Sequence, residues 1–162
     1  MRELITHNET ETLSAGAHLA SLLQGGDVLA MNGPLGAGKT CLVRGIAQCL
    51  GIATRDVSSP TFSILHEHAA GEQCRGIERV YHIDAYRLSG PEDLESIGWD
   101  ECLSDVNGVL LIEWASRIEP ALPSHAVHID MNHQAETERC LRLHVGDEVG
   151  GRFDGLWGEV ST

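Results

Sequence analysis

The chain has 162 residues, 42% of them hydrophobic, which is long enough for one domain with a buried core. Its net charge of −13 excludes strong binding of RNA or DNA by the chain alone, because an acidic surface gains little from counterion release on a phosphate backbone. Any role with nucleic acid would therefore run through a partner protein. No apolar run approaches membrane-spanning length, so we expect no membrane segment.

The first elements expected along the chain are a short strand and a packing helix. Residues 3–6 suit a strand, and Asn8 or Thr10 could cap the helix that follows, with acidic residues near its positive end. Apolar residues then recur at helical spacing until Gly25 and Gly26 end the helix. We expect this helix to pack against the core rather than to carry chemistry.

Residues 33–40, Gly-Pro-Leu-Gly-Ala-Gly-Lys-Thr, match the pattern of a phosphate-binding loop. The loop follows an apolar strand pattern at 27–32 and precedes a helical pattern at 41–50, which is the context that the motif needs. Backbone N–H groups of the loop and the positive end of the helix would face phosphate oxygens. Lys39 would bridge the outer phosphates, and the Thr40 hydroxyl would bind magnesium.

The lysine of this loop is the only lysine in the chain, since the other ten members of the 11 Lys and Arg residues are arginines. This indicates a compositional bias against lysine elsewhere. Position 39 is the one that keeps a flexible point charge, as phosphate binding requires.

The segment from Val57 to Phe62 contains a Ser-Pro turn flanked by small hydroxyl side chains. From the residues alone, a structural turn that leads into a strand at 63–68 is favoured over a functional role. His66 and His68 would share one face of that strand, and we expect them to be solvated because no third metal ligand lies nearby. A hairpin turn at 70–76 then leads to a second strand at 78–84.

Two carboxylates are expected at the ends of strands. Asp84 ends the strand 78–84, where phosphate-loop proteins usually place a carboxylate that organises magnesium. The continuous apolar run at 108–112 predicts a strand buried on both faces, which delivers Glu113 to the edge where the ligand crevice of an open α/β sheet lies. A buried carboxylate is costly unless it meets a cation, so Glu113 is a second candidate for the site. Trp114 is equally compatible with core packing and with a stacking surface.

The remaining segments complete one α/β domain. A short helix is expected from Pro91 to Gly98, and strands at 126–130 and 140–145 should form an antiparallel pair. We therefore expect a P-loop NTPase-like single domain with a mixed, mostly parallel sheet flanked by helices and an added antiparallel hairpin.

That domain would comprise residues 1–145, and the glycine-rich residues 146–162 would form a loosely ordered tail. The five cysteines are odd in number and contain no Cys-x-x-Cys pair. This pattern favours reduced thiols in a cytoplasmic protein over a disulfide framework or a zinc site.

Four landmarks that occur in one order resemble a specific bacterial family. They are the phosphate loop 33–40, Ser59-Pro60-Thr61-Phe62, His82-Ile83-Asp84-Ala85-Tyr86-Arg87-Leu88, and Leu111-Ile112-Glu113-Trp114 followed by Leu122-Pro123. Over residues 3–145 the chain resembles the TsaE (YjeE) family of small ATPases. The phosphate loop occurs in many families, whereas the other three landmarks together are specific.

The resemblance implies an ATPase needed for the threonylcarbamoyladenosine modification of tRNA at position 37. It implies ATP and Mg²⁺ as cofactors and the TsaD–TsaB complex as partner. Only through that complex would the protein act on tRNA, and neither DNA nor a membrane would be a partner.

The same resemblance implies roles for individual residues. Lys39, Asp84 and Glu113 would be catalytic, and Thr40 and Glu113 would hold the metal. Nucleotide would be bound by Glu9, Gly36, Ala37, Gly38, Lys39, Thr40, Cys41 and Trp114. A nucleotide-sensing switch would consist of Ser59, Pro60, Thr61 and Phe62.

Two positions depart from the family pattern. Members usually carry an acidic residue where this chain has Pro34, and a second hydroxyl where it has Cys41. Proline fits because that position need not donate its N–H, and the backbone N–H at 41 can still meet an α-phosphate. The hydroxyl contact at 41 is lost, so nucleotide affinity or turnover is expected to differ.

Three other functions are compatible with a phosphate loop. A small-molecule kinase would need a basic lid over the transferred phosphoryl group. Only scattered arginines are available for such a lid: Arg75, Arg79, Arg87 and Arg117. A GTPase would need a second lysine for its Asn-Lys-x-Asp motif, and none exists. A module that binds nucleotide without turnover would differ from an ATPase in phosphate release, measured with and without the partner complex.

Overall fold

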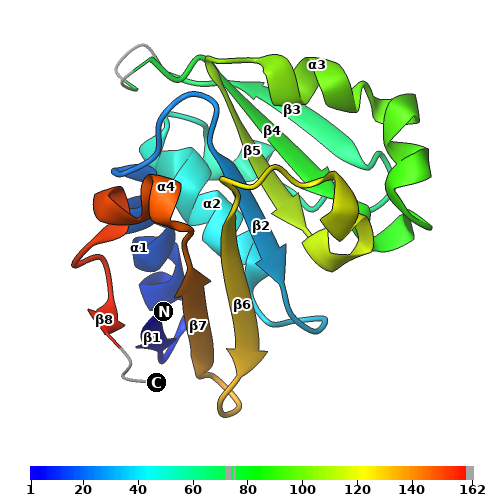
Figure 1. Ribbon diagram of the computed structural model, residues 1–162. Helices are drawn as coiled ribbons and strands as arrows, with labels where there is room; N and C mark the ends of the chain where they lie inside the picture. Colours follow the sequence, from blue (N-terminus) through cyan, green and yellow to red (C-terminus); the bar gives the residue numbers. More distant parts are fainter. Residues whose placement is uncertain (72–73, 75, 160–162) are drawn as a thin grey trace.

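The computed structural model describes residues 1–71, 74 and 76–159 (Figure 1). The hairpin turn expected at 70–76 includes residues 72, 73 and 75, which lie outside this description. The described strands form one sheet with the order β3-β4-β5-β2-β6-β7-β1-β8. Their bounds are β1 (Arg2–Thr6), β2 (Val28–Asn32), β3 (Leu65–Ala69), β4 (Arg79–Asp84), β5 (Gly108–Glu113), β6 (Val127–His133), β7 (Arg139–His144) and β8 (Gly158–Glu159).

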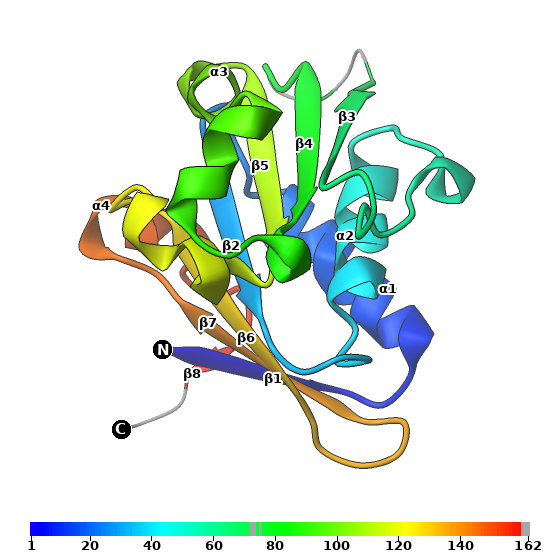
Figure 2. The same ribbon diagram turned by 90° about the vertical axis from the view of Figure 1, so that its right-hand side faces the viewer.

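Helices cover both faces of this sheet (Figure 2). The α-helices are α1 (Glu9–Ala20), α2 (Lys39–Cys49), α3 (Trp99–Ser104) and α4 (Asp147–Gly150), and short 3-10 segments are η1 (Thr54–Asp56), η2 (Ala85–Arg87), η3 (Pro91–Ile97), η4 (Ala115–Ala121) and η5 (Gly151–Phe153). Of the two candidate caps for α1, Asn8 is the one used, since its side-chain oxygen accepts the Glu11 N–H at 2.9 Å. In the described part of the chain, no helix is both long enough and apolar enough to cross a membrane.

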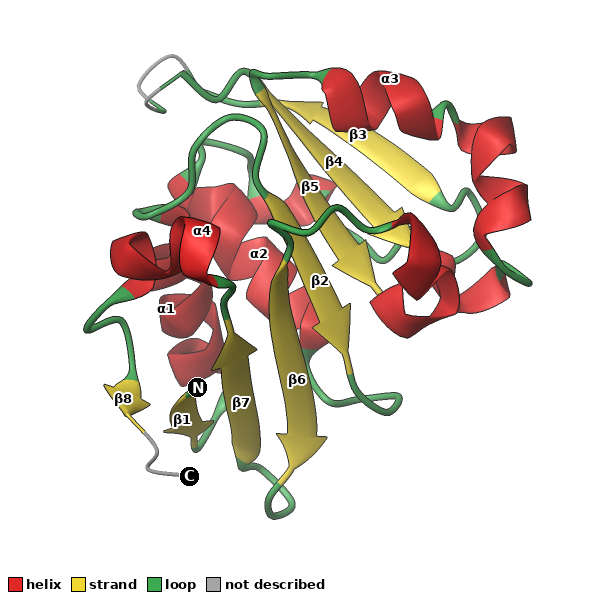
Figure 3. Cartoon of the chain, in the orientation of Figure 1, coloured by secondary structure: helices red, strands yellow, loops and turns green. Residues whose placement is uncertain are grey.

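The sheet is mixed, as predicted, but it contains more antiparallel pairing than expected. The central strands β4, β5, β2 and β6 are parallel, whereas β3 at one edge and β7, β1 and β8 at the other pair antiparallel (Figure 3). The short connections β3–β4 and β6–β7 cannot make a parallel crossover, which needs a dozen residues or more. Because β2, β4 and β5 are parallel, their carboxyl ends lie next to one another, along the edge of the sheet that is formed by strand ends rather than by an outermost strand.

Two apolar layers hold the sheet between its helices. One layer joins α1 and α2 to the sheet through residues such as Leu19, Ile46 and Leu111. The other joins α3 and the 3-10 segments to the opposite face through residues such as Trp99 and Ile112. Every residue of β5 is buried, which confirms the prediction from its continuous apolar run.

The C-terminal segment differs from the loosely ordered tail that was predicted. Residues 146–159 form α4, η5 and β8, the last of which pairs with β1. Phe153 is 0% exposed and Trp157 is 6% exposed, and the Arg152 guanidinium donates to both carboxylate oxygens of Asp27 at 2.7 Å. The prediction was wrong because the many glycines obscured these three anchoring side chains, which extend the packed domain beyond residue 145.

Replacing Phe153 with alanine should therefore destabilise the whole domain. Removing a fully buried phenylalanine side chain typically lowers the free energy of unfolding by about 3–5 kcal/mol. Urea unfolding of Phe153→Ala measures this loss, and Val106→Ala is the control because Val106 is 76% exposed. Equal stability of the two variants would show that the segment adds nothing to the core.

Candidate functional site

The phosphate loop lies between the carboxyl end of β2 and the start of α2. Gly33, with a φ of 140°, passes so close to β6 that an added Cβ would lie 2.1 Å from the Met131 carbonyl oxygen. Gly38 occupies the N-cap of α2 with a φ of 99° and supplies no side-chain hydrogen bond to the helix. The N–H groups at the start of an α-helix lack intrahelical partners, so those of α2 remain available to an anion.

Lys39 is held at the floor of this loop. Its Nζ donates to the carbonyl oxygens of Gly33 at 2.6 Å and Pro34 at 2.9 Å. The same ammonium lies 4.0 Å from the centre of the Trp114 ring, a cation–π contact. Lys39 is only 5% exposed, and this burial lowers the pKa of its amine, against the opposing effect of two nearby carboxylates.

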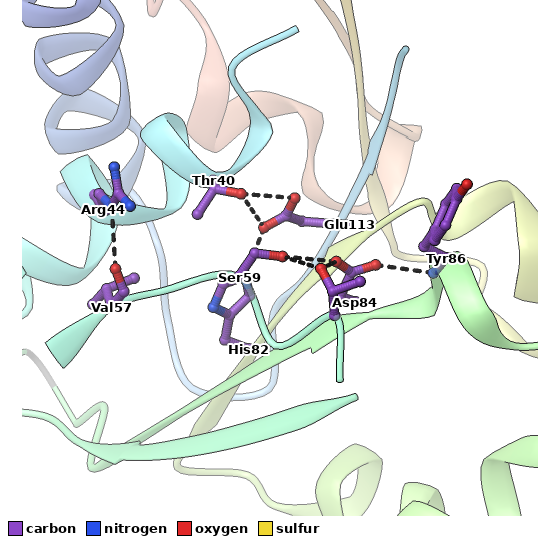
Figure 4. Close-up of polar contacts among 9 residues, drawn as sticks. Thr40, Arg44, Val57, Ser59, His82, Asp84, Tyr86 and Glu113 are labelled. Atoms are coloured by element: carbon purple, nitrogen blue, oxygen red, sulfur yellow. Dashed lines mark hydrogen bonds and ion pairs between the residues drawn. The ribbon is translucent and has the colours of Figure 1, made fainter. Parts of the chain in front are cut away.

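Glu113 lies directly across from the start of α2 (Figure 4). The Thr40 hydroxyl is 2.9 and 3.0 Å from the two carboxylate oxygens, and Nε2 of His82 is 2.8 Å from Oε1. Glu113 is 3% exposed, as expected for a carboxylate delivered by a buried strand. The parallel register of β4 and β5 pairs Glu113 with Asp84, so both predicted carboxylates reach the same edge.

Asp84 ties the segment 59–62 to the end of β4. Its Oδ2 accepts hydrogen bonds from the hydroxyls of Ser59 at 2.7 Å and Thr61 at 2.8 Å, and its Oδ1 accepts from the Tyr86 N–H at 2.9 Å. Asp84 is 2% exposed, so these donors satisfy a carboxylate that is largely removed from water. The Ser-Pro turn is thus part of the site, which the residues alone did not favour.

The backbone on either side of these contacts adopts uncommon conformations. Ile64, which follows the segment, and Trp114, which follows β5, have φ values of 69° and 58°. A left-handed conformation costs energy for a side chain with a Cβ, most of all for a β-branched one, and such residues tend to cluster at functional sites. Trp114 directly follows Glu113, and Ile64 lies two positions after Phe62.

A cleft of about 400 Å³ gathers most of the predicted site residues. It is lined by Leu35, Gly36, Ala37, Gly38, Lys39, Thr40, Cys41, Ser59, Thr61, Asp84, Tyr86, Glu113 and Trp114. A second pocket of about 210 Å³ adjoins it, since the two share Gly36, Gly38 and Cys41. Glu9 lines only the second pocket, together with Asn8, Thr12, Thr137 and Arg139.

Two predicted switch residues do not line the cleft. Pro60 is buried, and its carbonyl oxygen accepts a hydrogen bond from the Ile64 N–H at 2.6 Å, so Pro60 shapes the turn. Phe62 is 85% exposed, and the Arg87 guanidinium lies 4.5 Å from the centre of its ring.

Sequence reasoning missed two side chains of the site. The centre of the Tyr86 ring lies 5.1 Å from that of Trp114, with the two rings tilted by 53°, and both residues line the cleft, so Trp114 is not a core residue alone. His82 contacts Glu113 from β4. Both residues belong to the motif 82–88, and strand alternation places His82 on the same face as Asp84, which could have indicated its position.

The oxygen donors at the loop suit a magnesium ion. Thr40 supplies a hydroxyl and Glu113 a carboxylate, and Mg²⁺ is usually bound by one or two protein oxygens together with phosphate and water oxygens. The described residues contain no group of three or more His, Cys, Asp or Glu that could hold a metal ion.

Cys41 should be an unreactive thiol. Burial raises its pKa to about 11, and its Sγ lies 3.6 Å from the Glu9 carbonyl oxygen. At pH 8 a thiol with that pKa has roughly a hundredfold less thiolate than an ordinary cysteine. Mass spectrometry after brief iodoacetamide treatment at pH 8 should therefore find the exposed Cys49 modified and Cys41 largely intact, whereas equal modification would contradict the burial of Cys41.

The strand–loop–helix unit, with its lysine, threonine and neighbouring carboxylates, defines a protein of the P-loop class. A family model described as Threonylcarbamoyl adenosine biosynthesis protein TsaE matches residues 6–141. The chain belongs to the TsaE family.

Relatives of the same description come from distant bacteria. The tRNA threonylcarbamoyladenosine biosynthesis protein TsaE of Bacillus subtilis is 38% identical over 96% of this chain and 91% of its own length. The TsaE protein of Streptomyces coelicolor is 43% identical over 86% of this chain and 81% of its own length. The crystal structure of YdiB from Bacillus subtilis superimposes with a TM-score of 0.74 at 30% identity, covering 95% of this chain and 92% of that one.

Proposed function

We propose that this protein binds and hydrolyses ATP with Mg²⁺ and thereby serves the TsaD–TsaB complex in tRNA modification. Membership of the TsaE family gives it a role in threonylcarbamoyladenosine biosynthesis. The ATPase activity is supported chiefly by one observation: Lys39, Thr40, Asp84 and Glu113 line a single cleft at the start of α2.

Each of these residues has a distinct task in the proposed reaction. The N–H groups of the glycine loop and Lys39 bind the phosphates, while Thr40 and Glu113 hold the magnesium ion. When bound, the metal would offset the negative charge of the phosphate oxygens. Tyr86 and Trp114 line the cleft side by side, and the Trp114 ring keeps the ammonium of Lys39 in place.

Asp84 connects this chemistry to the segment 59–62. We expect it to orient the attacking water near the γ-phosphate, a task that would compete with its present bonds to Ser59 and Thr61. The bound nucleotide would then determine whether the hydroxyls of Ser59 and Thr61 remain hydrogen-bonded to Asp84. Ile64, two positions after the segment, has a left-handed φ of 69°, a strained conformation of the kind that occurs at switch regions.

The arginines proposed for a kinase lid do not favour that alternative. Arg79 is bound to Asp105 and keeps the pKa of that carboxyl well below its usual range, and Arg75 lies outside the described residues. Arg87 packs on Phe62, and Arg117 lies 5.9 Å from the centre of the Tyr86 ring. Among the arginines of this set that the structure describes, Arg87 and Arg117 lie against residues of the switch and the cleft, and both contact aromatic rings there.

The proposal is tested by measuring phosphate release from ATP. We expect slow release that requires Mg²⁺ and increases when TsaD and TsaB are added. Tight ATP binding with no phosphate release under any of these conditions would identify a nucleotide-binding module instead of an ATPase.

Partner binding should depend on the nucleotide, and tRNA binding should not occur directly. With a net charge of −13, the isolated protein is expected to show no useful affinity for tRNA at physiological salt. Co-purification with TsaD–TsaB should differ between ATP, ADP and no nucleotide. Tight tRNA binding by this protein alone would overturn the charge argument, and equal partner recovery in all three states would exclude a switch at 59–62.

A further inference from the structure

His82 is a fully buried histidine whose ring makes one hydrogen bond. It is 0% exposed, its Nε2 lies 2.8 Å from Oε1 of Glu113, and its Nδ1 has no partner among the described residues. A carboxylate oxygen that carries no proton can only accept a hydrogen bond, so the ring donates to Glu113 from Nε2. Because buried polar atoms normally find partners, a ring bonded only to Glu113 indicates a role tied to that carboxylate.

The other donor to Glu113 cannot fix its orientation alone. The Thr40 hydroxyl has a single proton, and it lies almost equally close to the two carboxylate oxygens, at 2.9 and 3.0 Å. Its oxygen is also the atom expected to bind magnesium. His82 instead contacts Oε1 alone, from a rigid strand, and so distinguishes one carboxylate oxygen from the other.

The sheet gives His82 a fixed place between the two carboxylates of the site. His82 and Asp84 lie two residues apart on β4 and therefore share a face, and the register pairs Asp84 with Glu113 on β5. In the view of Figure 4, His82 lies below Glu113, with which it makes its hydrogen bond. One strand thus carries both the carboxylate that binds the switch and the donor to the metal-site carboxylate.

We propose that His82 is a positioning residue, which orients Glu113 so that the carboxylate oxygen not bonded to His82 would be available to the magnesium bound with nucleotide. This inference rests on the proposed function, because it concerns the same metal site. Partners of this kind behind a metal-binding group typically alter metal affinity about 10- to 100-fold when they are removed.

The test compares His82→Leu with His82→Gln. Leucine removes the donor, whereas the terminal amide nitrogen of glutamine can replace Nε2. His68→Leu is the matched control, since His68 lies on the paired strand β3 and its ring contacts His66 rather than Glu113.

Contrary to the expectation of solvated rings, His66 and His68 are both half-buried, and burial lowers the pKa of His68.

Calorimetric titration of ADP over a range of Mg²⁺ concentrations supplies a readout that does not depend on turnover. In His82→Leu, we expect that roughly 10- to 100-fold more Mg²⁺ is needed to reach half of the metal-dependent gain in ADP affinity. The ADP affinity measured in the absence of metal should be unchanged. His82→Gln and His68→Leu should stay within a few-fold of the wild-type protein. Melting curves without nucleotide establish that each variant is folded.

A second measurement covers the case in which His82→Leu does not fold. In ¹⁵N-histidine NMR spectra of the wild-type protein, the His82 ring should carry a proton on Nε2. A ring protonated on Nδ1 alone would overturn the proposal, as would wild-type Mg²⁺ dependence in His82→Leu or an equal loss in the leucine and glutamine variants. A different result would be ADP binding by the wild-type protein that does not depend on Mg²⁺, although Nε2 carries a proton. That result would refute the proposed magnesium site, and with it the positioning role of His82.

Discussion

Replacing Lys39 with alanine is expected to weaken ATP binding by at least about a hundredfold. Two charge-assisted hydrogen bonds contribute about 1.5–3 kcal/mol each, so losing both removes roughly 3 kcal/mol or more, which corresponds to a factor of about a hundred in the dissociation constant. In the structure, the Lys39 ammonium donates hydrogen bonds to the carbonyl oxygens of Gly33 and Pro34. When ATP binds, phosphate oxygens would replace these carbonyl oxygens as acceptors. Calorimetric titration with ATP measures the loss.

Alanine also leaves space beside Trp114, because Lys39 is packed against that ring. Lys39→Met is therefore the matched control, since it keeps an unbranched side chain over the ring but lacks the charge. Both variants should lose ATP affinity, and their melting curves without nucleotide should show that they are folded. Wild-type affinity in either variant would refute the assignment of the phosphate loop.

Glu113→Gln should slow ATP hydrolysis by about a hundredfold or more, because the charge that holds magnesium is worth several kcal/mol in such sites. ATP affinity measured without metal should change little. The amide keeps one oxygen, which can still accept from His82 and Thr40, so the shape of the site is retained.

Phosphate release and ATP binding, each measured with and without Mg²⁺, separate the two roles of Glu113. A functional carboxylate predicts a large loss of turnover and of the metal-dependent part of binding. An equal loss of binding with and without the metal would show that Glu113 only supports the structure.

The main parts of the site could be predicted because they are local in sequence. A glycine loop between a strand and a helix determines its own geometry, and a carboxylate at the end of a buried strand is brought to the ligand edge by the sheet. Lys39, Thr40, Asp84 and Glu113 therefore line one cleft.

Contacts between distant segments were harder to predict. The bonds from Ser59 and Thr61 to Asp84 join residues more than 20 positions apart, and nothing in a Ser-Pro turn specifies which carboxylate it meets. The single bond of His82 likewise depends on the β4–β5 register, which sequence patterns do not reveal. Phe153 was missed because one aromatic residue among glycines gives no periodic signal.

The position of Lys39 has a consequence for chemical labelling. Because the chain has one lysine, the phosphate loop is the one place where an acylating reagent can modify a lysine side chain, apart from any reaction at the N-terminal amine. The lowered pKa of this amine increases the fraction that is neutral and nucleophilic, while its contacts with Gly33, Pro34 and Trp114 limit access. The fraction of acylated Lys39, read from the peptide that contains it, would therefore report how accessible this amine is with and without a bound nucleotide.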